Sequence, residues 1–209
     1  MNKDSFVLKC SKIAMPTFFY KCFPLLLITI SLIGCGDDGP SILSTDETSK
    51  AGELIEAANL DLKKIKVLYT DNEGKRHEIT NALSTDNVEE VRRISGEVVD
   101  LINEGTNYGN EAINKIRDAR EMKINPTFNE YLRLKEESLL KQLEAFSTFH
   151  TAARILRDNY DPKDANARAR VKTEFEELAD KYRDLMEKAR SNSVDANDLY
   201  KETVAKERG

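Results

Sequence analysis

The chain has 209 residues, of which 33% are charged and 7% are aromatic, and it contains no tryptophan. Its 37 acidic residues outnumber its 32 lysines and arginines, which argues against a nucleic-acid partner because nucleic acid calls for a basic face. The length suffices for one domain with a hydrophobic core, and the scarcity of glycine favours helices over a β-sandwich.

The first 36 residues show the order of a secretory signal. Four lysines precede residue 22, with Asp4 as the single acid, and residues 22–36 then carry no charge. A transmembrane helix needs about 20 apolar residues, whereas a shorter run after a basic start is typical of a signal segment that a peptidase removes. An uncleaved anchor helix is the alternative.

The apolar run ends in Leu32-Ile33-Gly34-Cys35, which resembles the lipobox of bacterial lipoproteins. In that family the cysteine sulfur carries a diacylglyceryl group, the chain is cut just before the cysteine, and the new amino group is often acylated. The resemblance implies that Cys35 is the lipidation site and that cleavage falls between Gly34 and Cys35. It covers only the targeting segment, and no family is recognised for the rest of the chain.

The cysteine count agrees with a lipid anchor. Cys10 and Cys22 lie in the segment that would be removed, so a mature chain would keep Cys35 alone and could form no internal disulfide. Exported domains often use disulfides, and a lone cysteine at the mature N-terminus fits a lipid carrier better. The stretch before the apolar run is long for a signal, so translation starting at Met15 is an alternative.

The sequence divides into a signal peptide at 1–34, a flexible tether at 35–45 and a helical domain at 46–209. Removal of the signal would leave 28 lysines and arginines against 36 acids, a net charge of −8. In the lipoprotein family, Asp directly after the lipidated cysteine often retains the protein in the inner membrane. Gly36 occupies that position here, so we expect outer-membrane attachment, with the domain in the periplasm or at the surface.

Residues 46–69 are expected to form the first long helix, because their apolar side chains repeat by seven on one face. The two rows are Ala51, Ala58, Ile65 and Ile55, Leu62, Tyr69. Residues 70–86 are interpreted as a long connection, with a turn at 71–74 and a short helical piece at 78–83.

Residues 88–123 are expected to form the second helix. Small side chains repeat by seven along it, at Val91, Val98, Gly105, Ala112 and Ala119. Glycine in a helix interior costs about 1 kcal/mol relative to alanine. Gly105 and Gly109 therefore indicate the close approach of a neighbouring helix, with a bend or break as the alternative.

The pair Asn125-Pro126 is a strong start signal for a third helix that reaches residue 160. Large side chains repeat by seven along it, and we expect this row to face the small row of the second helix. The row is Leu132, Leu139, Phe146, Ala153 and Tyr160. A second row with the same seven-residue spacing lies beside it on this helix, and the polar residues Lys135 and Gln142 interrupt that row. This favours an irregular bundle core over a regular coiled coil.

Asp161-Pro162 precedes a fourth helix at 163–190, and Asp195 is expected to cap a short last helix. Short connections make neighbouring helices antiparallel. The expected fold is all-α: an elongated up-down-up-down bundle of four long helices plus a short C-terminal helix.

No pattern indicates a catalytic residue, a cofactor or a metal. Metal sites in helical bundles commonly use Glu-x-x-His pairs, and neither His77 nor His150 has a glutamate three residues before it. His77 is interpreted as a solvated loop residue, or alternatively a contact for an acidic partner, and His150 as partly buried. Gly-x-Ser-x-Gly and glycine-rich phosphate motifs are missing from the sequence.

We therefore expect a non-catalytic lipoprotein of the cell envelope, anchored through Cys35, whose helices bind another envelope protein. A structural envelope spacer is one alternative. A carrier of small ligands is another, and an apolar cavity between the helices would favour it.

Overall fold

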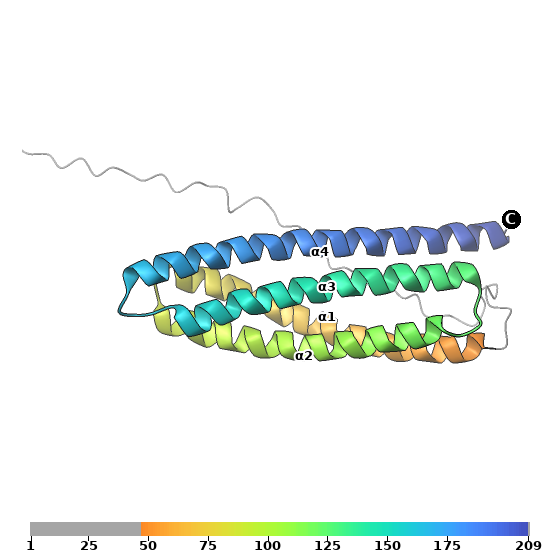
Figure 1. Cartoon of the computed structure of the whole chain (residues 1–209), viewed down its shortest axis with the longest axis horizontal. Coiled ribbons are helices and arrows are strands. Elements are labelled where there is room, and N and C mark those ends of the chain that lie inside the picture. The colour runs from red at the N-terminus through yellow and green to blue at the C-terminus, as the bar shows by residue number, and fades with distance from the viewer. Residues whose placement is uncertain (1–46, 209) are drawn as a thin grey trace, which may run out of the picture.

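The computed structural model describes residues 47–208, which form four helices joined by short turns. The helices are α1 (Thr48–Ser84), α2 (Val88–Arg120), α3 (Pro126–Asn159) and α4 (Ala165–Arg208). They run side by side and alternate in direction, so the expected all-α, up-down-up-down bundle is confirmed (Figure 1). At 1.5 Å per residue, α2 is about 50 Å long. None of the helices described between residues 47 and 208 is both long and apolar enough to span a bilayer.

The two ends of the bundle differ in what they contain. The α1–α2 and α3–α4 connections lie together at one end, which we call the turn end (Figure 1). The start of α1, the α2–α3 connection and the end of α4 lie at the other, which we call the terminal end. There the Glu47 carboxylate accepts a hydrogen bond from the backbone N–H of Lys123 at 2.5 Å, so the first described residue is tied to the α2–α3 connection.

Side-chain caps start three of the helices. The Asn87 side chain accepts a hydrogen bond from the backbone of Glu90, and Asn125 accepts one from Thr127 at 2.8 Å. These bonds satisfy backbone N–H groups that have no partner within the helix. The predicted Asn125-Pro126 start is confirmed, whereas α4 is capped by Asp164, three residues after Asp161.

The expected long connection at 70–86 is wrong, because α1 continues to Ser84. The buried face of α1 continues through Asn72, Ile79 and Leu83, and this burial outweighs the weak turn signal around Gly74. Only residues 85–87 leave the helix. Asp86 has a φ of 51°, in the left-handed region that Asp tolerates better than most residues.

The expected short C-terminal helix is also wrong, because α4 runs unbroken to Arg208. Ala189, Ser193 and Ala196 continue its buried face past the predicted end at residue 190, while Asp195 lies exposed within the helix. Asp195 could cap a new helix, but it does not end α4, because the buried face of α4 continues beyond it.

The small row of α2 allows its neighbours to approach closely. The helix is continuous through Gly105 and Gly109, so the alternative of a break is wrong. A Cβ atom at Gly109 would lie 2.5 Å from Leu143 Cδ2, so α3 approaches too closely here for even a methyl group to fit without a shift. At Gly105 a Cβ would touch both Leu68 of α1 and Phe146 of α3. The small row therefore faces α1 as well as the large row of α3.

The four contacts between neighbouring helices are unequal. Close backbone packing joins α1 to α2, α2 to α3, and α3 to α4. By contrast, α1 and α4 lack such backbone packing, and they meet where the Arg76 guanidinium of α1 lies over the Tyr182 ring of α4. We call this fourth contact the α1–α4 seam.

Candidate functional site

The residues that the sequence marked for function fall in different places. Gly34 and Cys35 lie outside the described residues, so the cleavage and lipidation sites stay predictions. His77 is exposed on α1 rather than in a loop. His150 is half-buried on α3, as expected, and burial, followed by the charge of Arg154, lowers its pKa. Within residues 47–208, no group of three or more His, Cys, Asp or Glu is arranged to hold a metal ion.

The two polar residues that interrupt the apolar row of α3 meet in the core. Lys135 is only 6% exposed and Gln142 only 5%. The Lys135 ammonium donates to Asn197 Oδ1 on α4 at 2.7 Å and lies 3.5 Å from Ser193 Oγ. With Ser138, which completes the group on α3, these five residues form what we call the core polar cluster.

The other members of the core polar cluster connect α3 to the α4 backbone. Ser138 Oγ donates to the carbonyl oxygen of Ala189 at 2.7 Å, and Gln142 Nε2 donates to Ser138 Oγ at 3.4 Å. The Lys135 ammonium also lies 5.4 Å from the centre of the Tyr131 ring, within the range of a cation–π contact. Tyr131 in turn contacts Tyr200 of α4, with ring centres 5.8 Å apart.

Lys135 carries a buried charge whose hydrogen-bond partners are neutral. In the described part of the chain, no carboxylate forms an ion pair with it. Burial therefore lowers the pKa of Lys135 from its ordinary value of 10.5 to about 8. A buried charge is expensive unless it is paired, so the core polar cluster destabilises the fold at neutral pH.

The other buried ionic groups of the bundle are paired with opposite charges. Asp61 of α1 forms ion pairs with Lys115 of α2 and with Lys64, which lies one turn along α1. Glu136 of α3 accepts from Arg117 at 2.6 Å and from Arg120, both on α2. Among the described residues, Lys135 is the one buried ionic group whose charge no oppositely charged side chain compensates, which is why it is the candidate functional residue.

A small cavity lies beside the core polar cluster. α1 contributes Ile55, Ala58 and Leu62 to its lining. Leu132 and Leu139 of α3 also line it, together with all members of the polar cluster except Asn197. The cavity has room for about one water molecule. The site therefore offers an amine with a pKa of about 8 in a space that admits no larger ligand unless the helices separate.

A second group in the α1–α4 seam escaped the sequence analysis. The Arg76 guanidinium lies 5.4 Å from the ring centre of Phe149 and 5.2 Å from that of Tyr182, and it pairs with Glu73 at 2.6 Å. It was missed because residues 70–86 were interpreted as a connection. The seven-residue spacing that leads from Ile65 to Ile79 was the signal that could have revealed it.

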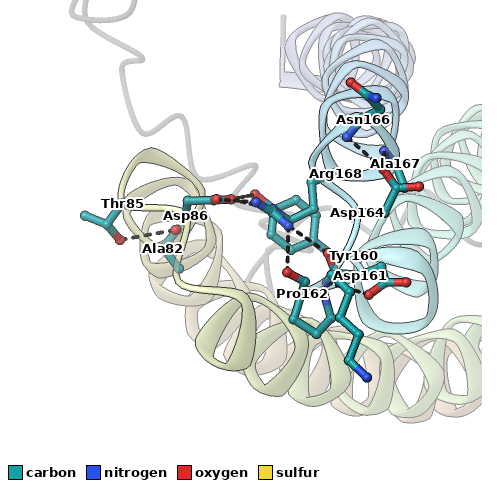
Figure 2. A network of polar contacts seen from close by, with 11 residues as sticks. Ala82, Thr85, Asp86, Tyr160, Asp161, Pro162, Asp164, Asn166, Ala167 and Arg168 are labelled. Atoms are coloured by element: carbon teal, nitrogen blue, oxygen red, sulfur yellow. Dashed lines mark hydrogen bonds and ion pairs between the residues drawn. The ribbon is translucent and has the colours of Figure 1, made fainter.

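A third polar group ties the two connections of the turn end together. Arg168 donates to both carboxylate oxygens of Asp86, at 3.0 and 2.9 Å, and to the carbonyl oxygens of Asp161 and Pro162 (Figure 2). The Tyr160 hydroxyl donates to Asp86 Oδ1 at 2.8 Å. The hydrogen bonds from Arg168 and then Tyr160 hold the pKa of Asp86 below its ordinary value. This network is a clamp between the α1–α2 and α3–α4 turns.

Comparison with protein-family models, with curated proteins and with solved structures finds no match to the chain. Its function must therefore be argued from its own residues.

Proposed function

We propose that the chain is a lipid-anchored lipoprotein of the bacterial cell envelope whose helical bundle binds another envelope protein and catalyses no reaction. The observation that carries this proposal is Leu32-Ile33-Gly34-Cys35 at the end of an apolar run that follows a basic start. Lipid on Cys35 would attach the chain to a membrane, and by the identity of Gly36 we favour the outer membrane.

The shape of the bundle supports an interaction role. Residue 47 lies at the terminal end, so an anchor at Cys35 would leave that end nearest the membrane and the turn end about 50 Å further out. The helices would then present long charged faces to other envelope proteins. The elongated shape also suits the second candidate, a structural spacer. The carrier alternative is disfavoured, because the cavity beside Lys135 has room for about one water molecule.

The lipid anchor is tested by labelling cells with radioactive palmitate and fractionating their membranes. We expect the wild type and Cys22→Ser to carry label, and Cys35→Ser to lose both label and cleavage, because the thioether requires the sulfur of that cysteine. The Cys22→Ser variant is the matched control, since it removes a cysteine of the signal segment only. Equal labelling of Cys35→Ser and wild type would rule the lipoprotein proposal out.

The interaction role is tested separately by crosslinking intact cells and purifying the protein. A binding function predicts one envelope protein captured in near-equal amount, and its loss when substitutions reverse the charge of one helix face. Attachment to the cell wall without a protein partner would favour the spacer. In the same fractionation, recovery with inner-membrane markers would contradict the outer-membrane assignment.

A further inference from the structure

The α1–α4 seam is the least tightly closed side of the bundle. Its helices lack the close backbone packing of the other three pairs. It also contains a polar group that is buried without a good partner. The Tyr182 hydroxyl of α4 lies beside that of Tyr69 of α1 without reaching good hydrogen-bond geometry. This weakens the closed form, because in water the hydroxyl would be fully hydrogen-bonded.

The core polar cluster lies on the inner side of this seam. α1 presents only apolar side chains to the cavity beside Lys135, α2 presents Ile116, and α4 presents Ser193 and Asn197. The titratable groups closest to the ammonium are the phenols of Tyr131 and, behind it, Tyr200. Burial raises the pKa of the Tyr131 phenol, so this group supplies no negative charge to the ammonium. Separation of α1 from α4 is therefore the simplest way to return the Lys135 ammonium to water.

We propose that the bundle opens along the α1–α4 seam, with the α1–α2 and α3–α4 hairpins separating, and that protonation of Lys135 shifts the protein towards the open state. The two hairpins are each closely packed, and the α2–α3 contact between them serves as the hinge together with the Asp86–Arg168 clamp, which holds the turn end closed. Opening exposes Lys135 and the apolar side chains around it.

The size of the effect follows from the two proton affinities of Lys135. In the closed bundle its pKa is about 8, and in water it returns to 10.5. The open state therefore binds more protons between these values, and its population falls as the pH rises. From pH 7 to pH 9 the open fraction should decrease about tenfold.

The opening does not rest on the proposed binding function, so the two can fail separately.

The test introduces a cysteine at Ala58, which is fully buried and lines the cavity on the α1 side. The full-length protein is treated with a thiol reagent at pH 7 and pH 9, and labelling of each cysteine is measured by peptide mass. Rates are divided by those of an unstructured peptide, which corrects for thiolate formation. We expect the corrected rate at residue 58 to fall about tenfold.

Two substitutions, each combined with the cysteine at residue 58, test whether Lys135 causes the pH dependence of labelling. In Lys135→Met the corrected rate at residue 58 should no longer depend on pH. In Lys141→Met, which removes an exposed lysine of the same helix, the tenfold dependence should remain. A pH dependence that survives Lys135→Met, or none in the wild type, overturns the proposal.

A second cysteine distinguishes seam opening from global unfolding. Ala112 is equally buried but lies on α2, away from the α1–α4 seam. A cysteine there should be labelled more slowly and without the tenfold dependence. Equal rates at residues 58 and 112 would show that the whole bundle unfolds, and the proposal would be wrong.

Discussion

The two buried glycines of α2 should respond differently to replacement by alanine. Gly105→Ala should raise the free energy of unfolding, whereas Gly109→Ala should lower it. In a helix interior, alanine is favoured over glycine by about 1 kcal/mol. A methyl group at Gly105 would meet Leu68 Cδ1 at 3.8 Å and Phe146 Cε2 at 3.9 Å, which are ordinary van der Waals contacts. Its burial contributes about 0.8 kcal/mol. We therefore expect Gly105→Ala to raise the free energy of unfolding by about 1–2 kcal/mol.

At Gly109 the same substitution meets an obstacle. The new methyl carbon would lie 2.5 Å from Leu143 Cδ2 and 3.2 Å from its Cγ, so Leu143 must turn or α3 must move. Overpacking of this kind costs about 1–3 kcal/mol, which cancels or exceeds the gain in helix propensity. We expect Gly109→Ala to lower the free energy of unfolding by up to about 2 kcal/mol. In a Leu143→Ala background, where the obstacle is removed, Gly109→Ala should become stabilising.

Urea unfolding of residues 45–209, followed by circular dichroism, measures these differences, provided the slope with denaturant is unchanged. If both alanine variants stabilise the bundle equally, α3 does not approach α2 at Gly109 as described. If both destabilise it equally, Gly105 is also in close contact and the reasoning fails there.

Three further substitutions test the core. Lys135→Met should stabilise the bundle by about 2–3 kcal/mol at pH 7. Since the folded pKa of Lys135 lies below the unfolded one, wild-type stability should rise relative to that of Lys135→Met between pH 8 and 10.5, as measured by urea unfolding at several pH values. Ala112→Leu should lower the free energy of unfolding by about 1–3 kcal/mol by overpacking the small row, and an unchanged melting temperature would contradict its burial. Asp61→Asn should lower it by about 1–3 kcal/mol through the loss of charge-assisted bonds from Lys115 and Lys64. Although burial alone would raise the pKa of Asp61, these bonds lower it overall, so this contribution should be present near neutral pH and disappear in acid as the pH falls below about 4.

The core rows and one helix start were predictable because they depend on local pattern. Apolar residues spaced by seven must share a helix face, and Asn125-Pro126 combines a capping side chain with a residue suited to the first turn. The same reasoning revealed that Lys135 and Gln142 interrupt an apolar row. The resemblance of Leu32-Ile33-Gly34-Cys35 to a lipobox also comes from the sequence alone, and it stays a prediction because these residues lie outside the described part of the chain.

The lengths of α1 and α4 were decided by tertiary packing. A glycine or a capping residue changes helix stability by about 1 kcal/mol, whereas burial of one large apolar side chain contributes about 1.5–3 kcal/mol. Around Gly74, the packing of Ile79 and Leu83 therefore prevails over the turn signal. After Asp195, the packing of Leu199 and Tyr200 against the core continues the helix in the same way.

The partners of Lys135 were likewise decided only by the tertiary structure. The sequence places a lysine on a buried face, but it does not determine whether a carboxylate or a neutral oxygen lies opposite. That depends on the offset between α3 and α4, which brings Ser193 and Asn197 to the ammonium. The offset is set by the summed packing of two whole helices, so the lowered pKa of Lys135 is a property of the assembled bundle rather than of any local stretch of sequence.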